Sequence, residues 1–212
     1  MPFEDDKGAA CAPRTLQWSD LRVPGAAPSA PAWSARIAPG VVLLHDASGE
    51  ASAQWLPVLA AQAAMQYGAE QVFWHSARAP LKQPEQQVGD WLAAQVQRWP
   101  QWDAQAWQQH VQGFQLQAQL TKPLWHLSTG SLRKLWLAAA LASGAAVTLV
   151  DEPISGLDGS ALRYLSQALD ALGEQLAQPL ARARWVLVAH WEALPGVTWD
   201  EQLPMPALSA LE

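Results

Sequence analysis

The sequence predicts an α/β protein whose parallel sheet is covered on both faces by helices. Three short apolar runs, at 41–44, 146–150 and 185–189, show no alternation of polar and apolar residues. Strands with both faces buried have this pattern, and parallel sheets are where such strands usually occur. Helix-like segments separate the three runs, and this strand–helix alternation is typical of parallel α/β folds.

Length, composition and charge favour a globular protein that does not bind nucleic acid. Half of the 212 residues are apolar and 15% are charged, so we expect one domain over 1–212, with 1–14 as a loose terminus. The net charge is −6, and no region concentrates lysine and arginine as nucleic-acid binders do. The lone cysteine, Cys11, excludes an internal disulfide and a cysteine-based zinc site.

The sequence predicts no direct insertion into a membrane. The segment Met1–Lys7 is polar and acidic, without the apolar region of a signal peptide. The longest apolar stretch, 135–149, contains Ser143 and Gly144 and is shorter than the roughly 20 residues that span a bilayer. We therefore expect a cytoplasmic protein that reaches a membrane only through a partner.

The first third of the chain is predicted to alternate strands with one helix. Leu16–Val23 has the composition of a first strand, and a turn at Pro39-Gly40 leads into the apolar run at 41–44. A small polar loop then precedes a helix at 52–65, which Pro57 should kink or shorten. A short strand follows at 71–74.

The middle of the chain is predicted to be a helical subdomain covering about 85–142. Gln, Ala and Trp dominate 85–119, where Pro100 divides two helices and Asp103 can cap the second. A third helix at 131–142 should end at Gly144, because glycine tolerates the left-handed conformation after a helix. Several of the 13 tryptophans recur in helix-like segments and are predicted to be packing residues: Trp55, Trp91, Trp102 and Trp136.

The last third places two carboxylates and a histidine directly after apolar strands. Asp151 and Glu152 follow the run at 146–150, a helix is expected at Gly159–Leu176, and His190 follows 185–189. Ligands of open α/β sheets bind at the carboxyl ends of the strands. There Asp151 could hold Mg²⁺ and Glu152 could polarise an attacking water. The structural alternative is that both carboxylates only cap the following turn.

Four motifs occur in an order and spacing that resemble those of ABC-type ATPases. Leu127-Ser-Thr-Gly-Ser131 resembles the signature motif, Val147–Pro153 the Walker B motif, Ile154–Asp158 the D-loop, and Val186–His190 the strand of the switch histidine. The resemblance covers about 16–200. It implies a P-loop NTPase-like sheet with a helical signature subdomain. The antiparallel β segment usual in the family should be reduced, since the strand at 71–74 follows the preceding helix directly.

The resemblance also implies ATP and Mg²⁺ as cofactors and assigns site residues. It implies that Glu152 and His190 are catalytic and that Asp151 and Ser52 bind the metal. It also implies that five residues contact the nucleotide: Ser128, Gly130, Asp158, Gly49 and Ser52. The signature loop of this family contacts ATP held by the opposite subunit of a dimer, and a helix N-terminus suits that anion. The loop departs from the family pattern at Thr129 and Ser131, and its helix has Ala139 where the family usually has arginine.

The phosphate-binding loop departs most from the family pattern G-x-x-x-x-G-K-[ST]. The corresponding residues are His45-Asp-Ala-Ser-Gly-Glu-Ala-Ser52. Aligning Ser52 with the metal-binding Ser/Thr puts Ala51 at the lysine, and shifting by one so that Gly49 is the glycine puts Glu50 there. Neither register supplies a cation, and Asp46 and Glu50 bring carboxylates close to a polyanion. The sequence therefore predicts weak binding of ATP in the chain's own site.

Two further positions depart from the family. No aromatic residue stands near 23–25, where the family stacks adenine, although Trp18 or Trp33 could substitute. The glutamine that follows the strand at 71–74 in the family corresponds to His75 or Ser76.

Two functional hypotheses follow. In the first, the chain is a binding and coupling subunit of a membrane transporter that pairs with another ABC subunit in a homo- or heterodimer and docks on a membrane permease. In the second, it is an active ATPase with a non-standard phosphate loop that energises an ABC transporter. A role in DNA repair or translation is disfavoured by the acidic charge and by the absence of long arms.

Overall fold

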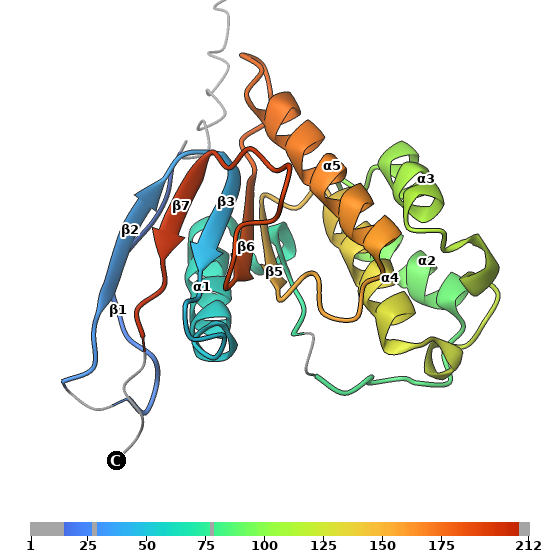
Figure 1. Cartoon of the computed structure of the whole chain (residues 1–212), viewed down its shortest axis with the longest axis horizontal. Helices are drawn as coiled ribbons and strands as arrows, with labels where there is room; N and C mark the ends of the chain where they lie inside the picture. Colours follow the sequence, from blue (N-terminus) through green and yellow to red (C-terminus); the bar gives the residue numbers. More distant parts are fainter. Residues whose placement is uncertain (1–14, 27–28, 77–78, 208–212) are drawn as a thin grey trace, which may run out of the picture.

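The computed structural model describes residues 15–26, 29–76 and 79–207, and the terminus predicted at 1–14 lies outside them. Its main sheet has five strands in the order β4-β5-β6-β3-β7, and every pairing is parallel (Figure 1). The strands are β3 (Gly40–His45), β4 (Val72–Trp74), β5 (Val147–Asp151), β6 (Trp185–His190) and β7 (Glu201–Pro204). The parallel arrangement predicted for the three apolar runs is confirmed, whereas β7 was not predicted.

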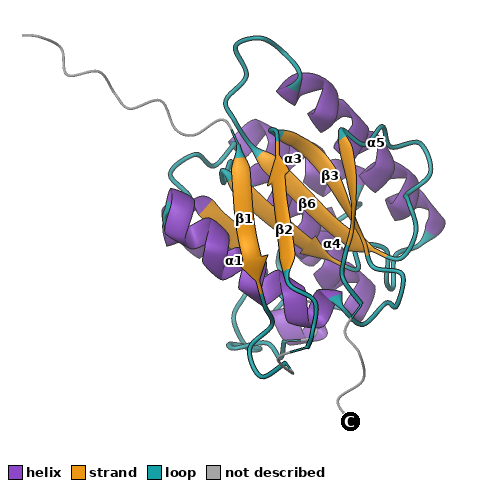
Figure 2. Cartoon of the chain, turned by 90° about the vertical axis from the view of Figure 1, so that its left-hand side faces the viewer, coloured by secondary structure: helices purple, strands orange, loops and turns teal. Residues whose placement is uncertain are grey.

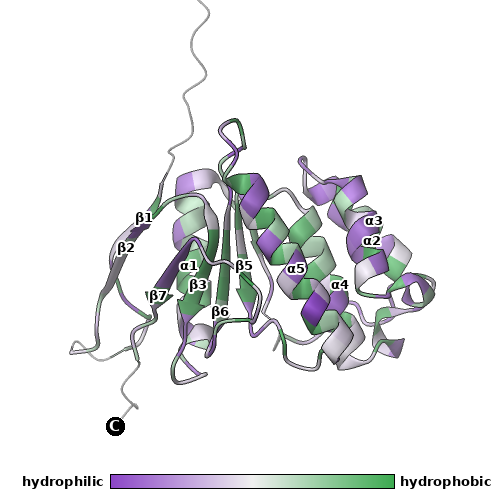
Figure 3. Cartoon of the chain, turned by 45° about the horizontal axis from the view of Figure 1, so that its top comes forward, coloured by the Kyte–Doolittle hydropathy of each residue, from purple (hydrophilic) through white to green (hydrophobic). Residues whose placement is uncertain are grey.

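Helices cover both faces of this sheet, as predicted. Residues of β3, β4, β5 and β6 are divided between two hydrophobic clusters, because successive side chains of a strand point to opposite faces. In β3, Val41 belongs to the cluster of the helical part of the molecule and Val42 to the cluster beneath α1 (Ser52–Tyr67). Figure 3 shows the apolar strands between these two layers.

Two antiparallel strands form a separate small sheet. In it, β1 (Leu16–Leu21) pairs with β2 (Trp33–Ile37), and Figure 2 shows this sheet in front of β3 and β6. The predicted reduction of the antiparallel segment is confirmed. Strand β1 ends before Val23, earlier than predicted, and β2 was not predicted.

The helical part of the chain matches its prediction. It contains α2 (Val88–Arg98), α3 (Ala104–Gly113) and α4 (Thr129–Ala142), with α2 and α3 on the side of α4 that faces away from the sheet (Figure 1). Asp103 caps α3 as predicted, since its carboxylate accepts a hydrogen bond of 2.9 Å from the Ala106 N–H. Helix α5 (Gly159–Leu176) has the predicted bounds.

Pro57 was expected to kink or shorten the helix after the loop; the shortening is wrong, and the kink stays a prediction. Helix α1 runs through Pro57 to Tyr67. Pro57 and Ala53, whose carbonyl loses its helical partner, are both exposed, so water can satisfy that carbonyl. Trp55 and Leu56 are fully buried on the other side of the helix, and their burial outweighs the missing hydrogen bond.

The tryptophans predicted to be packing residues are in the core or against it. Trp55 and Trp91 are buried, and Trp102 and Trp136 pack against the cluster around the helical part. Within the described ranges, no helix is both long and apolar enough to cross a membrane.

Candidate functional site

The carboxyl edge of the parallel sheet brings together the residues that the sequence predicted to be catalytic. Asp151 ends β5 opposite Ala189, and His190 ends β6 opposite His45 of β3. Asp151 is 4% and His190 1% exposed. Because parallel strands present their carboxyl ends at one edge, three separate sequence segments share this site.

Glu152 and His190 face each other at this edge. The His190 Nδ1 and Glu152 Oε2 atoms are 3.2 Å apart, within the distance of an ion pair but without hydrogen-bond geometry. Glu152 has a φ of +45°, which is uncommon for a residue with a side chain. Such a conformation persists only when its surroundings hold it. Arg133 does so, as its guanidinium donates hydrogen bonds to the carbonyl oxygens of Asp151 (2.8 Å) and Glu152 (2.7 Å).

Two buried oxygen atoms fit a magnesium ion. The Oγ of Ser52 and the Oδ1 of Asp151 are buried without a hydrogen-bond partner. Hydroxyl and carboxylate oxygens are ligands that Mg²⁺ prefers, and it usually combines one or two of them with water and substrate phosphates. Both residues are those predicted to bind the metal, and this role stays a prediction.

The loop 45–52 is organised around the carboxylate of Asp46. This carboxylate accepts hydrogen bonds from the backbone N–H groups of Ser48 (3.2 Å), Gly49 (3.0 Å) and Ser52 (2.8 Å), and from the Ser48 hydroxyl (2.7 Å). The Ser48 Oγ in turn accepts from the N–H groups of Glu50 and Ala51, both at 3.2 Å. Every N–H from 48 to 52 is therefore satisfied inside the loop.

The backbone N–H groups of the loop that could donate to a phosphate are occupied in this conformation. A phosphate loop binds its ligand through free backbone N–H groups and a lysine. Here Asp46, only 1% exposed, takes those N–H groups, and position 51 is a buried alanine. Burial raises the pKa of Asp46, whereas the hydrogen bonds from Ser52 and Ser48 lower it. The lowering is the larger effect, so the pKa lies below the ordinary value.

Sequence reasoning named Asp46 only as a repelling charge and missed its role as an internal acceptor. The signal was the order Asp-x-Ser-Gly, because aspartate at the start of a turn accepts hydrogen bonds from the backbone just after it. Gly49, predicted to contact the nucleotide, has a φ of +70° in this turn and donates its N–H to Asp46.

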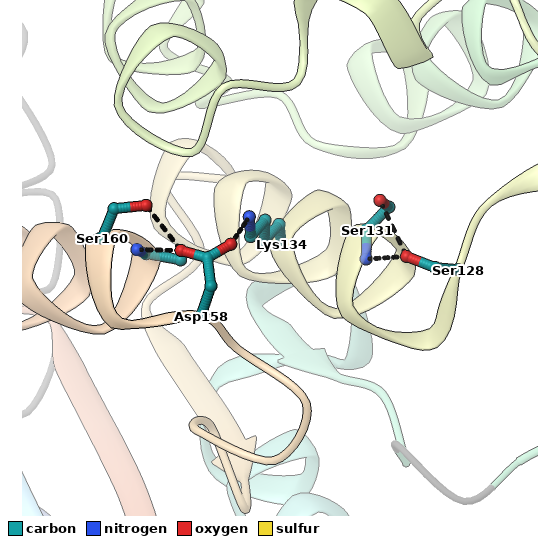
Figure 4. Close-up of polar contacts among 6 residues, drawn as sticks. Ser128, Ser131, Lys134, Asp158 and Ser160 are labelled. Atoms are coloured by element: carbon teal, nitrogen blue, oxygen red, sulfur yellow. Dashed lines mark hydrogen bonds and ion pairs between the residues drawn. The ribbon is translucent and has the colours of Figure 1, made fainter.

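The signature loop exposes Ser128 and Thr129 and ends in a capped helix N-terminus. Ser128 is the N-cap of α4: its Oγ accepts a hydrogen bond from the Ser131 N–H (3.2 Å) and donates one to the Ser131 Oγ (3.0 Å) (Figure 4). Gly130 packs on the D-loop so closely that a Cβ there would lie 2.4 Å from the carbonyl oxygen of Gly156. Glycine is therefore required at 130 by this packing.

Asp158 joins the signature helix to α5. Its carboxylate caps α5 through the Ala161 N–H (2.8 Å), accepts from the Ser160 hydroxyl, and lies 2.5 Å from the Lys134 Nζ (Figure 4). The hydrogen bond from Lys134, followed by those from Ser160 and Ala161, holds the pKa of Asp158 well below its usual range. Contact of Asp158, Ser128 or Gly130 with a nucleotide stays a prediction.

Neither Trp18 nor Trp33 presents a face for an adenine ring. They are 2% and 7% exposed, and their rings meet edge to face with centroids 5.1 Å apart. Trp33 also meets Trp55 edge to face. Both serve the core beneath the β1–β2 sheet, so the suggestion that one of them replaces the adenine-stacking residue is wrong.

His75, at the end of β4, stacks on Trp136 of α4 with ring centroids 3.7 Å apart. It lines a cavity of about 110 Å³ between the sheet and α4. Burial, and then the charges of Arg133 and Lys82, lower its pKa from 6.5 to about 4.

Folding should become less favourable as pH falls from about 6.5 to 4. In this pH window His75 is protonated in the unfolded protein but stays neutral in the folded protein. The free energy of unfolding therefore decreases as the pH falls. His110, with a pKa also lowered to about 4 by burial and then by Arg184, acts in the same direction.

His75→Phe keeps the stacking and should remove about half of the loss of unfolding free energy between pH 7 and 5. Urea unfolding at the two pH values measures this loss. The exposed His126→Phe is the control; an unchanged loss in His75→Phe would contradict the assignment.

No protein-family model matches this sequence, and no curated protein matches it in sequence. Solved structures match in fold. A putative ABC transporter ATP-binding protein from Pyrococcus furiosus aligns over 90% of this chain and 97% of its own, with a TM-score of 0.68 and 18% identity. An ATP-binding subunit of an ABC transporter aligns over 74% of this chain and 72% of its own, with a TM-score of 0.55 and 16% identity. An RNase-L inhibitor aligns over 82% of this chain and 36% of its own, with a TM-score of 0.52 and 16% identity.

The sheet order, the loop before α1 and the residues at the carboxyl edge define an α/β fold of the P-loop NTPase kind. Within that class, the chain has the fold of the ATP-binding domain of ABC-type ATPases.

Proposed function

We propose that this chain is an ATP-binding-cassette subunit of a membrane transporter that binds ATP poorly in its own site and completes the site of a partner. The partner is a second subunit of the same fold, and a membrane permease is the third component. The solved structures of similar fold include ATP-binding proteins of ABC transporters, which supports the transporter assignment.

One observation carries this proposal: the loop that should hold phosphate offers a carboxylate instead of a cation. None of the residues 45–52 is a lysine or arginine, and the buried Asp46 carboxylate accepts from the loop's own N–H groups. Two like charges a few ångströms apart repel by about 1 kcal/mol in water and several times more near a protein surface. Lost attraction and added repulsion both weaken the binding of ATP.

The signature loop supports the second half of the proposal. Ser128 is exposed and caps α4 without help from another chain, so the helix N-terminus is preformed for an anion. Gly130 and Lys134 attach this loop and its helix to the D-loop at Gly156 and Asp158. An exposed, capped helix N-terminus in a chain whose phosphate loop has no cation suits a subunit that contributes across a dimer interface.

A second candidate is an active ATPase that tolerates a non-standard phosphate loop. It is favoured by the three residues Asp151, Glu152 and His190, which converge at one sheet edge, and by the unpartnered Ser52 Oγ and Asp151 Oδ1. These groups would serve the same site as the missing lysine, so an intact set indicates continued use of that site.

Titration of the isolated chain with MgATP separates the two candidates. Isothermal titration calorimetry should show a dissociation constant weaker than about 1 mM, since each 1.4 kcal/mol of lost interaction costs about tenfold in affinity. Titration with Mg²⁺ alone is the control for metal binding at the carboxylates. A dissociation constant in the low micromolar range would favour the active ATPase and overturn the proposed function.

A further inference from the structure

Two different defects separate this loop from one that binds phosphate. The first is the missing lysine, which removes attraction. The second is the hydrogen-bonding state of the backbone, because the N–H groups of Ser48, Gly49 and Ser52 already donate to the Asp46 carboxylate. Only the second defect is a property of the folded loop, and it is caused by a single side chain.

We propose that Asp46 decides the ligand class of this loop: its carboxylate occupies the position of a phosphate oxygen and closes the loop to phosphorylated ligands independently of the missing lysine. This inference rests on the proposed function, since it concerns the same site. A carboxylate and a phosphate both present anionic oxygens to backbone N–H groups at a helix N-terminus. Asp46 therefore acts as a permanently bound anion.

Displacing Asp46 is costly for an incoming phosphate. The carboxylate is 1% exposed and would lose four hydrogen bonds: three from backbone N–H groups and one from the Ser48 hydroxyl. Hydrogen bonds to an ionised group are about twice as strong as neutral ones. Once displaced, the carboxylate would stand beside the phosphate as a like charge. An intramolecular anion also needs no association, so it outcompetes a free one.

Ser52, whose N–H donates to the Asp46 carboxylate, also has a hydroxyl without a hydrogen-bond partner. Ser52 is the first residue of α1 and is fully buried. A buried hydroxyl without a partner is unusual in a folded protein. With Asp46 removed, the three released N–H groups and this hydroxyl are the groups that a phosphate would meet.

The test compares full-length variants by calorimetric titration with MgATP and with inorganic pyrophosphate. Glu50→Gly/Ala51→Lys supplies the glycine and lysine of the family pattern and leaves Asp46 in place. We expect this double variant to bind both probes weakly. Adding Asp46→Gly should tighten binding by at least about a hundredfold, since each charge-assisted hydrogen bond contributes roughly tenfold. Equal affinity with and without Asp46→Gly would overturn the inference.

Asp46→Asn distinguishes occupancy of the N–H groups from charge repulsion. The asparagine oxygen can still accept from the loop, whereas the charge is gone. On the Glu50→Gly/Ala51→Lys background, Asp46→Asn should therefore tighten binding at least about tenfold, but less than Asp46→Gly. Equal gains for the two would show that repulsion alone acts and would contradict occupancy. Circular dichroism melting of every variant checks folding, and Asp46→Ala, which also lacks a side-chain acceptor, replaces Asp46→Gly in the comparison if the glycine variant does not fold.

The experiment separates failure of this inference from failure of the proposed function. Tight MgATP binding by the unmodified chain would overturn both. Weak binding by the unmodified chain, together with equally tight binding by the double and triple variants, would leave the proposed function standing and overturn only the role of Asp46.

Discussion

Ser128→Arg is expected to lower the ATP turnover of the complex with the partner subunit by at least about tenfold, or roughly 1.4 kcal/mol of transition-state stabilisation. Ser128 is exposed and forms the N-cap of α4. In the proposed complex, the arginine side chain would fill the space in which the helix N-terminus approaches the partner's nucleotide. The measurement is steady-state phosphate release by the reconstituted complex.

Because Ser128→Arg also removes the cap on α4, a second variant must separate helix stability from the trans contact. Ser128→Asp retains a good N-cap but places an anion where the partner's γ-phosphate would lie, so it should also reduce turnover. Ser128→Thr preserves the hydroxyl and should remain active. Normal turnover of Ser128→Asp would show that this loop makes no contact with a phosphate.

In the same complex, Glu152→Gln should change turnover little. Glu152 belongs to the chain's own site, where Asp46 takes the N–H groups of the phosphate loop. A general base contributes only where substrate is bound. Loss of hydrolysis in Glu152→Gln would show that the chain's own site holds ATP and would support the active ATPase.

Trp55→Ala should lower the free energy of unfolding by about 3–5 kcal/mol. Trp55 is fully buried in α1, meets Trp33 edge to face at 5.3 Å, and donates its indole N–H to the carbonyl oxygen of Pro206 (3.0 Å). The substitution leaves a large cavity and an unpaired carbonyl between the helix and the β1–β2 sheet. The midpoint temperature of thermal unfolding should fall by about 10 °C or more.

Trp125→Ala is the matched control for Trp55→Ala. Trp125 is 51% exposed, so its removal should change the free energy of unfolding by less than about 1 kcal/mol. Similar losses for Trp55→Ala and Trp125→Ala would contradict the assignment of Trp55 to the core.

The sequence by itself determined the class of the fold and the place of the candidate site. Uninterrupted apolar runs predicted the buried strands β3, β5 and β6, because a parallel sheet buries both of its faces. Asp151, Glu152 and His190 were placed at the carboxyl edge because they directly follow those strands. The bounds predicted for α5, Gly159–Leu176, are those of the structure.

Short or polar elements were decided by tertiary contacts. Strand β2 exists because it pairs with β1, and β7 because it pairs with β3 at the edge of the main sheet; neither has an apolar run of its own. Helix α1 passes through Pro57 because the opposite side of the helix is buried. Local propensity is weak where packing supplies most of the free energy.

The hydrogen bonds of the candidate site likewise could not be predicted from the sequence. The sequence of the loop 45–52 showed that a lysine is missing. Only the folded loop shows that Asp46 accepts hydrogen bonds from the N–H groups of Gly49 and Ser52. The bond from Arg133 to the carbonyl of Glu152 joins residues 19 positions apart. Which donor meets which acceptor depends on the three-dimensional path of the backbone, and residue order alone does not specify that path.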